Sequence, residues 1–350
     1  HAILRHLSLR TPKIRVRVVG TNGKGSTAWF LAAALRATGL KVGLYTSPHI
    51  LRFHERIRIQ GREVPDRLLR LAAARVRPYA ERYRASWFEA ATAIALVCFS
   101  KARVDVEILE AGVGGRLDAT TAVPADMCLI TPIALDHQDW LGESLSAIAR
   151  EKAYAMRGCA VCLSAPQEPS VRRVLRAFAH GLAFARRWRG PLAARGAFQR
   201  INAGLAWAAV ERLRALGRIP DRPAAAHRAI ARTRVPGRCM RIFYKGAELW
   251  LDPAHNAHAA RALAKALASA APLDAAFVYT RADRDPAPIA EVLRRIARRV
   301  ETSRNPEHAP PRVQAYLGRN PGAKILVCGS FRTVAAMLAA VEDDEGVARR

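Results

Sequence analysis

The segment Val18-Val19-Gly20-Thr21-Asn22-Gly23-Lys24-Gly25-Ser26-Thr27 decides the fold class of this chain. A valine-rich run over residues 15–19 leads into it and an amphipathic stretch to about residue 36 follows, so the segment is predicted to join a strand to a helix. Its glycines let consecutive backbone N–H groups face a phosphate, Lys24 supplies a positive charge, and the helix N-terminus adds its dipole. A glycine turn at a helix start explains the glycines but not the lysine. The segment therefore predicts a phosphate-binding loop.

The glycine spacing of this loop differs from the Walker A pattern G-x-x-x-x-G-K-[ST]. Gly20 and Gly23 lie closer together, and an additional Gly25 separates the lysine from the serine. We expect the whole loop to surround a bound phosphate group. The residues concerned are Thr21, Asn22, Gly23, Lys24, Gly25, Ser26 and Thr27.

Short β-branched runs alternate with longer amphipathic stretches along the chain, which is typical of βα units around a parallel sheet. The chain has 350 residues, which suits two domains. We predict an α/β protein in which residues 1–240 form a P-loop-containing domain with a mostly parallel sheet. Residues 241–350 are predicted to form a smaller, Rossmann-like α/β domain, with a helix over residues 287–299. Residues 220–223, which contain two prolines, are predicted to be a loop.

The chain is strongly basic, with 57 Lys+Arg against 29 Asp+Glu and a formal net charge of +28. Its 49 arginines are spread singly or in pairs, without a block of like charges, which favours solvated surfaces over a nucleic-acid-binding tail. A preference for polyanionic partners is the alternative. The longest apolar run, residues 87–99, contains Glu89 and is shorter than the roughly 18–20 residues that cross a bilayer. We expect a cytoplasmic protein without a membrane partner.

Six scattered cysteines do not form a disulfide framework. Only Cys159 and Cys162 form a CxxC pair, and they flank the apolar residues Ala160 and Val161. We expect this pair to belong to a buried strand, and a metal or redox role is the less favoured alternative.

Ten ordered segments share a pattern with one enzyme family. They are residues 20–27, 45–49, Phe88-Glu89 with Thr92, 110–120, 135–137 with Leu141-Gly142, 151–153, Gln199 with Asn202-Ala203, 236–238, 252–256 and 328–330. In these segments the chain resembles the folylpolyglutamate synthase/dihydrofolate synthase family, ATP-dependent ligases of the Mur ligase superfamily. The resemblance extends from residue 18 to residue 330 and implies a Mur ligase type of fold.

The resemblance also implies an activity. Family members transfer the γ-phosphoryl group of ATP to a folate or dihydropteroate carboxylate, and the amine of L-glutamate then attacks the acyl phosphate. Such phosphoryl transfer requires positioning and charge neutralisation, for which Mg²⁺ with oxygen ligands is suited. The implied cofactors are ATP and Mg²⁺ in two sites. The implied partners are these small molecules and not nucleic acid or a membrane, and we expect a monomer.

Four residues are implied to form the catalytic and metal centre. Ser47 and Glu110 would hold the first Mg²⁺, and Glu110 would share the second with His137 and Lys152. A protonated lysine cannot ligate a metal, so Lys152 would act as a carbamate. With Lys24, the residues Glu110, His137 and Lys152 make up the implied catalytic set. Taken singly, each has a plain alternative: a carboxylate at a strand end, a packed histidine, and a lysine at the exposed end of a helix.

The remaining implied contacts are with nucleotide and substrate. The loop residues 21–27 are joined at ATP by Asn202, Arg238 and Asp252. The implied substrate residues are Phe88, Leu117, Asp118, Ala119 and His255. The ring of Phe88 could stack on a flat pterin or belong to the core equally well.

Three other interpretations remain open. A peptidoglycan Mur ligase is disfavoured because those enzymes typically lack the additional Gly25. A basic nucleic-acid-binding protein on a P-loop scaffold rests on the net charge alone. A catalytically impaired family member would still bind nucleotide without turning it over.

Overall fold

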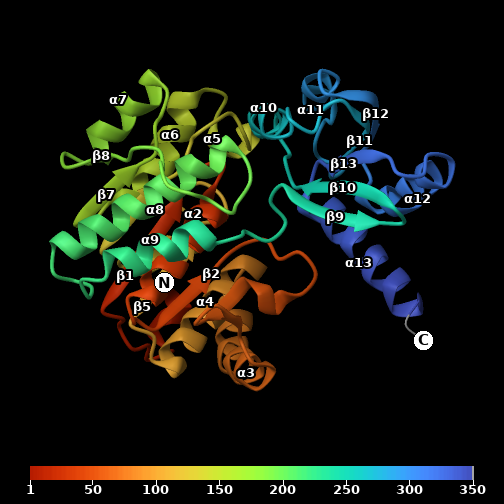
Figure 1. Cartoon of the computed structure of the whole chain (residues 1–350). Coiled ribbons are helices and arrows are strands. Elements are labelled where there is room, and N and C mark those ends of the chain that lie inside the picture. Colours follow the sequence, from red (N-terminus) through yellow and green to blue (C-terminus); the bar gives the residue numbers. More distant parts are fainter. Residues whose placement is uncertain (349–350) are drawn as a thin grey trace. The chain divides into compact units, whose positions relative to one another are not determined.

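The computed structural model describes residues 1–348, and the chain divides into two compact units. The first unit comprises His1–His49, Phe53–Ala193 and Gln199–Thr233. The second comprises Ile50–Arg52, Ala194–Phe198 and the chain from Arg234 onward. The predicted domain boundary after residue 240 falls just inside the second unit. Figure 1 follows the chain through both units.

The first unit is built on an eight-stranded sheet in the order β4-β3-β2-β5-β1-β6-β7-β8. All neighbours from β2 to β8 are parallel, while β3 and β4 add an antiparallel edge. This confirms the predicted α/β class with a mostly parallel sheet. The strands are β1 Ile14–Val19, β2 Val42–Tyr45, β3 Ile57–Ile59, β4 Arg62–Glu63, β5 Val106–Glu110, β6 Met127–Ile130, β7 Val161–Ser164 and β8 Ala183–Phe184.

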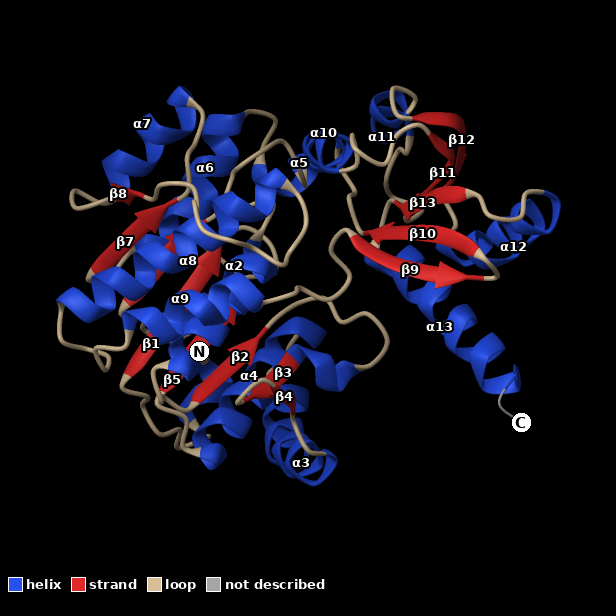
Figure 2. Ribbon diagram, in the orientation of Figure 1, coloured by secondary structure: helices blue, strands red, loops and turns tan. Residues whose placement is uncertain are grey.

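Helices cover both faces of this sheet (Figure 2). The α-helices are α1 Ala2–Arg5, α2 Lys24–Ala37, α3 Asp66–Arg82, α4 Trp87–Ala102, α5 Gln138–Leu141, α6 Leu145–Ala153, α7 Pro169–Phe178, α8 Ala197–Ala215 and α9 Pro223–Arg232. Three short 3₁₀ helices are η1 Phe53–Arg56, η2 Ala119–Ala122 and η3 Tyr154–Met156. The capping box at the start of α4 shows how local sequence sets a boundary, because Ser86 and Glu89 each accept from the other's backbone N–H.

The second unit has a five-stranded sheet in the order β12-β11-β13-β10-β9. Its strands are β9 Met240–Tyr244, β10 Ala247–Asp252, β11 Leu273–Tyr279, β12 Ala297–Ser303 and β13 Lys324–Cys328. Only β9 is antiparallel to its neighbour, as a hairpin with β10. The helices are α10 Ala257–Ala266, α11 Ala287–Leu293, η4 Pro306–His308, α12 Ala309–Arg319 and α13 Phe331–Ala348. The helix predicted over residues 287–299 is wrong in its second half, where β12 begins.

The central strand positions the loop that follows it. β1 lies between β5 and β6, with Val18 opposite Glu110 and Val19 opposite Ile130. Because all three strands are parallel, their carboxyl ends lie at one edge of the sheet, and the loops after them are neighbours. All six residues of β1 are buried. Among residues 1–348, no helix is both long enough and apolar enough to cross a bilayer.

Two of the buried residues of β1 are arginines. The Nε of Arg15 donates to Glu107 Oε2 on β5 at 2.7 Å, and its Nη1 donates to the carbonyl of Pro124. Burial raises the pKa of Glu107, and the neighbouring Arg15 opposes that rise. The pair is nearly out of solvent, with side-chain exposures of 8% and 2%.

Replacing Glu107 with Ala is expected to lower the free energy of unfolding by about 3–5 kcal/mol, because the buried guanidinium of Arg15 loses its counter-charge. The matched control is Glu81→Ala, which breaks an exposed i,i+4 pair with Arg77 and should cost within about 0.5 kcal/mol. Urea denaturation followed by circular dichroism measures both. Equal losses in the two variants would contradict the structural role of the buried pair.

Candidate active site

The loop after β1 is held by close contacts that only glycine permits. Gly23 has φ of 90°, and a Cβ there would lie 2.2 Å from Asn202 Oδ1 on α8. A Cβ on Gly20 would lie 2.0 Å from Thr131 Oγ1, just after β6. The N–H groups of Thr21 and Asn22 both donate to the carbonyl of Pro132 at 3.1 Å. The first turn of α2 then presents backbone N–H groups that have no partner within the helix, which suits an anion.

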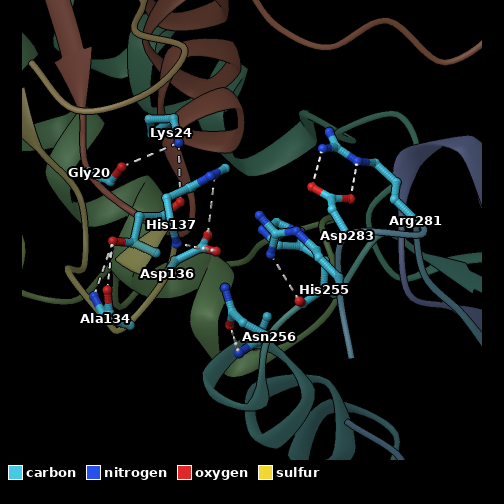
Figure 3. A network of polar contacts seen from close by, with 12 residues as sticks. Gly20, Lys24, Ala134, Asp136, His137, His255, Asn256, Arg281 and Asp283 are labelled. Carbon is cyan, nitrogen blue, oxygen red and sulfur yellow. Dashed lines mark hydrogen bonds and ion pairs between the residues drawn. The ribbon is translucent and has the colours of Figure 1, made fainter. Parts of the chain in front are cut away.

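Two lysines share one backbone carbonyl of this loop. Lys24 Nζ donates to the carbonyl of Gly20 at 3.3 Å and to that of Thr21 at 3.2 Å. Lys152 Nζ, on α6, donates to the same Gly20 carbonyl at 2.9 Å. Figure 3 shows Lys24 turned back toward Gly20. The two amines predicted to be catalytic therefore meet at one atom of the loop.

Lys152 is only 3% exposed, so it is not the solvent-exposed helix end that was its plain alternative. Burial lowers the pKa of Lys152 to about 7, and the positive charge of Lys24 adds to this effect. Asp136 and Asp118 oppose it without reversing it. A substantial fraction of Lys152 is therefore a neutral, nucleophilic amine near pH 7.

The carboxylate of Glu110 faces the start of α2. Glu110 ends β5, is 3% exposed, and accepts a hydrogen bond from the N–H of Ser47 at 2.9 Å. A Cβ on Gly25 would lie 3.3 Å from Glu110 Oε2. The additional glycine of the loop thus lets this carboxylate approach the helix N-terminus closely, which gives the departure from Walker A spacing a physical reason.

His137 lies in the loop after β6, as the N-cap residue of α5 with φ of 51°. Its Nε2 is 3.9 Å from Asp136 Oδ2, and Figure 3 shows the two side chains together. Among the side chains that the structure describes, those of residues 1–344, no three from His, Cys, Asp or Glu are grouped to hold a metal ion. The implied metal set draws one ligand from a lysine, which supplies an oxygen only after carbamylation. The remaining donors, a serine hydroxyl, a buried carboxylate and an imidazole, fit a Mg²⁺ ion that retains waters and phosphate ligands.

Asn202 is fixed by a residue absent from the predicted site. Its Nδ2 donates to Gln199 Oε1 at 3.0 Å, which leaves Oδ1 facing Gly23. Gln199 is fully buried on α8, and its Nε2 has no hydrogen-bond partner within residues 1–348. The i,i+3 spacing of the two amides on one helix was the signal that could have identified Gln199.

The residues predicted to bind the substrate differ in their exposure and in their hydrogen bonds. Asp118 accepts from the N–H groups of Gly112, Val113 and Thr120, so its carboxylate organises its own loop. Leu117 beside it is 84% exposed, and Ala119 begins η2.

Phe88 is half-buried on α4 and packs in the core cluster of that helix, so the core alternative for its ring holds in part. A Cβ on Gly112 would lie 2.9 Å from the ring of Phe88, whose centroid is 6.0 Å from that of Tyr45. The ring therefore also borders the loop that contains Leu117.

The second unit contains the other residues that are predicted to contact ATP or the substrate. Asp252, at the end of β10, is buried and accepts from the N–H groups of Cys239 and Ala254 at 2.8 and 2.9 Å. Burial raises the pKa of Asp252, while Arg238 nearby opposes the rise. The guanidinium of Arg238 lies 4.6 Å from the ring centroid of Phe331. The Nδ1 of His255 is 3.0 Å from the carbonyl of Pro253.

A glycine-rich loop that carries a lysine and joins the central strand of a mostly parallel sheet to the next helix is typical of P-loop α/β proteins. No protein-family model matches the chain. A bifunctional folylpolyglutamate synthase/dihydrofolate synthase, solved with Mn, AMPPNP and L-glutamate bound, is 30% identical. The match covers 97% of this chain and 92% of that chain with a TM-score of 0.81. The chain belongs to the folylpolyglutamate synthase/dihydrofolate synthase family, which confirms the resemblance seen in the sequence.

Two further relatives support this family membership. An FPGS–AMPPCP–folate complex is 28% identical with a TM-score of 0.85, over 96% of this chain and 93% of that chain. A dihydrofolate synthase/folylpolyglutamate synthase of Escherichia coli (strain K12) is 48% identical over 140 residues. That sequence match spans 40% of this chain and about a third of the length of the curated relative (33%).

Replacing Gly23 with Ala should destabilise the first unit by about 1–3 kcal/mol more than replacing Gly217 with Ala. Both glycines have a positive φ, so both variants carry the backbone strain. Only at Gly23 does the new methyl group meet another residue, since nothing lies within 4 Å of a Cβ at Gly217. Urea denaturation of both variants measures the difference. Equal stabilities would show that α8 does not hold the loop at Asn202.

Proposed function

We propose that the chain is an ATP-dependent ligase that joins L-glutamate to a folate or dihydropteroate carboxylate. The observation that carries the proposal is the loop at Gly20, where Lys24 and a buried Lys152 meet beside Glu110 at the carboxyl edge of the sheet. Relatives that match nearly the whole chain were solved with AMPPNP and L-glutamate, and with AMPPCP and folate. These ligands are nucleotide analogues and the two compounds that such a ligase joins.

The loop residues bind the nucleotide in this proposal. The N–H groups at the start of α2, through Gly23, Lys24, Gly25, Ser26 and Thr27, receive the phosphates. Lys24 leaves the carbonyls of Gly20 and Thr21 to neutralise phosphate charge. Thr21 and Asn22 hold the loop in shape through Pro132. Further ATP contacts are assigned to Asn202, Arg238 and Asp252.

Four residues are proposed to hold Mg²⁺ in two sites. Ser47 and Glu110 serve the first, and Glu110, His137 and carbamylated Lys152 serve the second. Bound Mg²⁺ neutralises phosphate charge during phosphoryl transfer. The relative solved with Mn supports a divalent ion in this family. The depressed pKa of Lys152 supports the modification, because a neutral amine is the form that reacts with CO₂.

The proposed ligase reaction has two steps. A carboxylate oxygen of the pterin substrate attacks the γ-phosphorus of ATP, the bond to the β-phosphate oxygen breaks, and ADP leaves. The glutamate amine then attacks the acyl carbon, an amide bond forms, and phosphate leaves with the former carboxylate oxygen. Phe88, Leu117, Asp118 and Ala119 are proposed to position the pterin substrate, and His255 is assigned to substrate as well. We further propose that the chain acts on these small molecules as a cytoplasmic monomer.

An ADP-release assay on the purified chain tests the function. ADP should form only when ATP, Mg²⁺, L-glutamate and a folate or dihydropteroate are present together, and the pterin product should gain the mass of one glutamyl group. ADP formation that is independent of L-glutamate would contradict the ligase. Nucleotide binding without any turnover would identify a catalytically impaired family member instead.

Lys24→Ala should weaken Mg²⁺–ATP binding at least tenfold, because the loop loses its point charge, while the fold is retained. Isothermal titration calorimetry measures the affinity. Lys101→Ala removes an exposed lysine from the last turn of α4 and is the matched control, for which unchanged affinity is expected. Equal affinities of wild type and Lys24→Ala for Mg²⁺–ATP would show that the loop does not bind the nucleotide through Lys24.

Lys152 should carry a carbamate at pH 8 and lose it as the pH falls below 7. Its pKa of about 7, against the ordinary 10.5, leaves it mostly neutral at the higher pH, and protonation at the lower pH removes the nucleophile. Carbon-13 NMR after incubation with ¹³C-bicarbonate measures the carbamate carbonyl. Lys152→Arg should abolish the signal and Lys101→Arg should retain it. A signal that survives in Lys152→Arg would assign the carbamate elsewhere.

A further inference from the structure

A row of three side chains crosses the sheet of the first unit, away from the loop at Gly20. Arg17 on β1 is in register with Cys128 on β6, and Cys128 is in register with Cys162 on β7. Partners in register on adjacent parallel strands lie about 5 Å apart and point to the same face. This face packs against α6, η3 and α7, in the core cluster that contains Cys128 and Cys162.

A third cysteine joins this row from the loop before β7. Cys159 Sγ lies 3.6 Å from the carbonyl of Ala155 in η3, and Arg17 Nη1 donates to the same carbonyl at 2.6 Å. Cys128 and Cys159 are also near enough that each thiol shifts the pKa of the other. The shared carbonyl and the register of Arg17 with Cys128 place both thiols beside one guanidinium.

The guanidinium of Arg17 is unusual because it is buried without a counter-charge. It is 3% exposed, and among the side chains described, those of residues 1–344, no carboxylate pairs with it. Two of its nitrogens donate to the carbonyls of Ala155 and Val123, and its Nε has no partner. A buried cation of this kind favours an anion next to it, and the neighbouring thiols are the groups that can become one.

The three thiols differ in reactivity. Interaction with the Cys128 thiol lowers the pKa of Cys159, Arg17 lowers it further, and burial and Asp126 oppose this. Burial, with the nearby Cys159, raises the pKa of Cys162 to about 12. Cys159 is half-buried, whereas Cys128 and Cys162 are buried. An oxidant from solvent therefore meets the most nucleophilic of the three first.

We propose that Cys128 and Cys159 form a hydroperoxide-sensitive dithiol that closes to a disulfide. The Cys159 thiolate attacks the O–O bond of hydrogen peroxide, gains one oxygen as a sulfenic acid, and releases hydroxide. The Cys128 thiol then attacks that sulfur, the S–O bond breaks, and water leaves as the disulfide forms. Peroxide is reduced and the two thiols are oxidised. The bond joins β6 to the loop after η3, which directly follows the helix that carries Lys152.

The structure favours a thiol pair over a metal site. Up to residue 344, where the described side chains end, no group of three His, Cys, Asp or Glu side chains is placed to bind a metal. Cys162 Sγ lies 3.8 Å from the carbonyl of Met156, whereas Cys159 Sγ shares the carbonyl of Ala155 with Arg17. Two sulfurs and one guanidinium form the site.

The full chain, treated with hydrogen peroxide, tests this inference. Remaining thiols are alkylated, and a non-reducing tryptic digest is analysed by mass spectrometry. The wild type, Cys162→Ser and Cys98→Ser should yield a Cys128–Cys159 link, and Cys98 serves as a buried control cysteine of α4. The link should be absent from Cys159→Ser and from Cys128→Ser, and Cys159 should be oxidised at least about tenfold faster than Cys98.

A second measurement keeps the inference testable if a variant folds poorly. In Cys128→Ser, or in Cys128→Ala as a substitute, the sulfenic acid at Cys159 lacks its resolving thiol and should accumulate as a dimedone adduct. A Cys159–Cys162 link in place of the Cys128 link would overturn the proposal. So would oxidation of Cys159 and Cys98 at the same rate.

Discussion

The carbonyl of Gly20 is the point on which the candidate site depends. Lys24 and Lys152 come from α2 and α6, two elements far apart in the sequence, and both donate to this one oxygen. The loop can bring its carbonyl to both only because Gly20 and Gly23 lie where a side chain would collide with Thr131 and Asn202. The backbone of the loop thus brings the two amines to one oxygen atom.

Buried charged residues lie on the two strands next to this loop, β1 and β5. The central strand carries two buried arginines, one paired with Glu107 and the other held by backbone carbonyls. A further buried charge, Glu110, ends the neighbouring strand and faces the helix N-terminus at Gly25. Part of the large arginine excess therefore serves the interior of the fold. This weakens the case for a nucleic-acid-binding protein, which rested on the net charge alone.

Sequence reasoning identified the loop, the α/β class and the family, because glycine spacing and β-branched runs act locally. The loop predicted over residues 220–223 is confirmed for residues 220–222, and Pro223 begins α9, since proline is favoured in the first turn of a helix. The prediction failed where tertiary contacts decide. Residues 297–303 form an edge strand instead of continuing α11. The hydrogen bonds that the Asp118 carboxylate accepts within its loop are shown by no periodicity, whereas the i,i+3 spacing of Gln199 and Asn202 was visible in the sequence.

The central claim is that this loop directs the γ-phosphoryl group of ATP onto a substrate carboxylate. The fate of the carboxylate oxygen tests it most directly. A folate substrate labelled with ¹⁸O in its side-chain carboxylate is incubated with the chain, Mg²⁺–ATP and L-glutamate, and the phosphate released is analysed by mass spectrometry. We predict one ¹⁸O atom in each phosphate formed with product. Phosphate without ¹⁸O, alongside glutamylated product, would contradict the acyl phosphate and the account built on it.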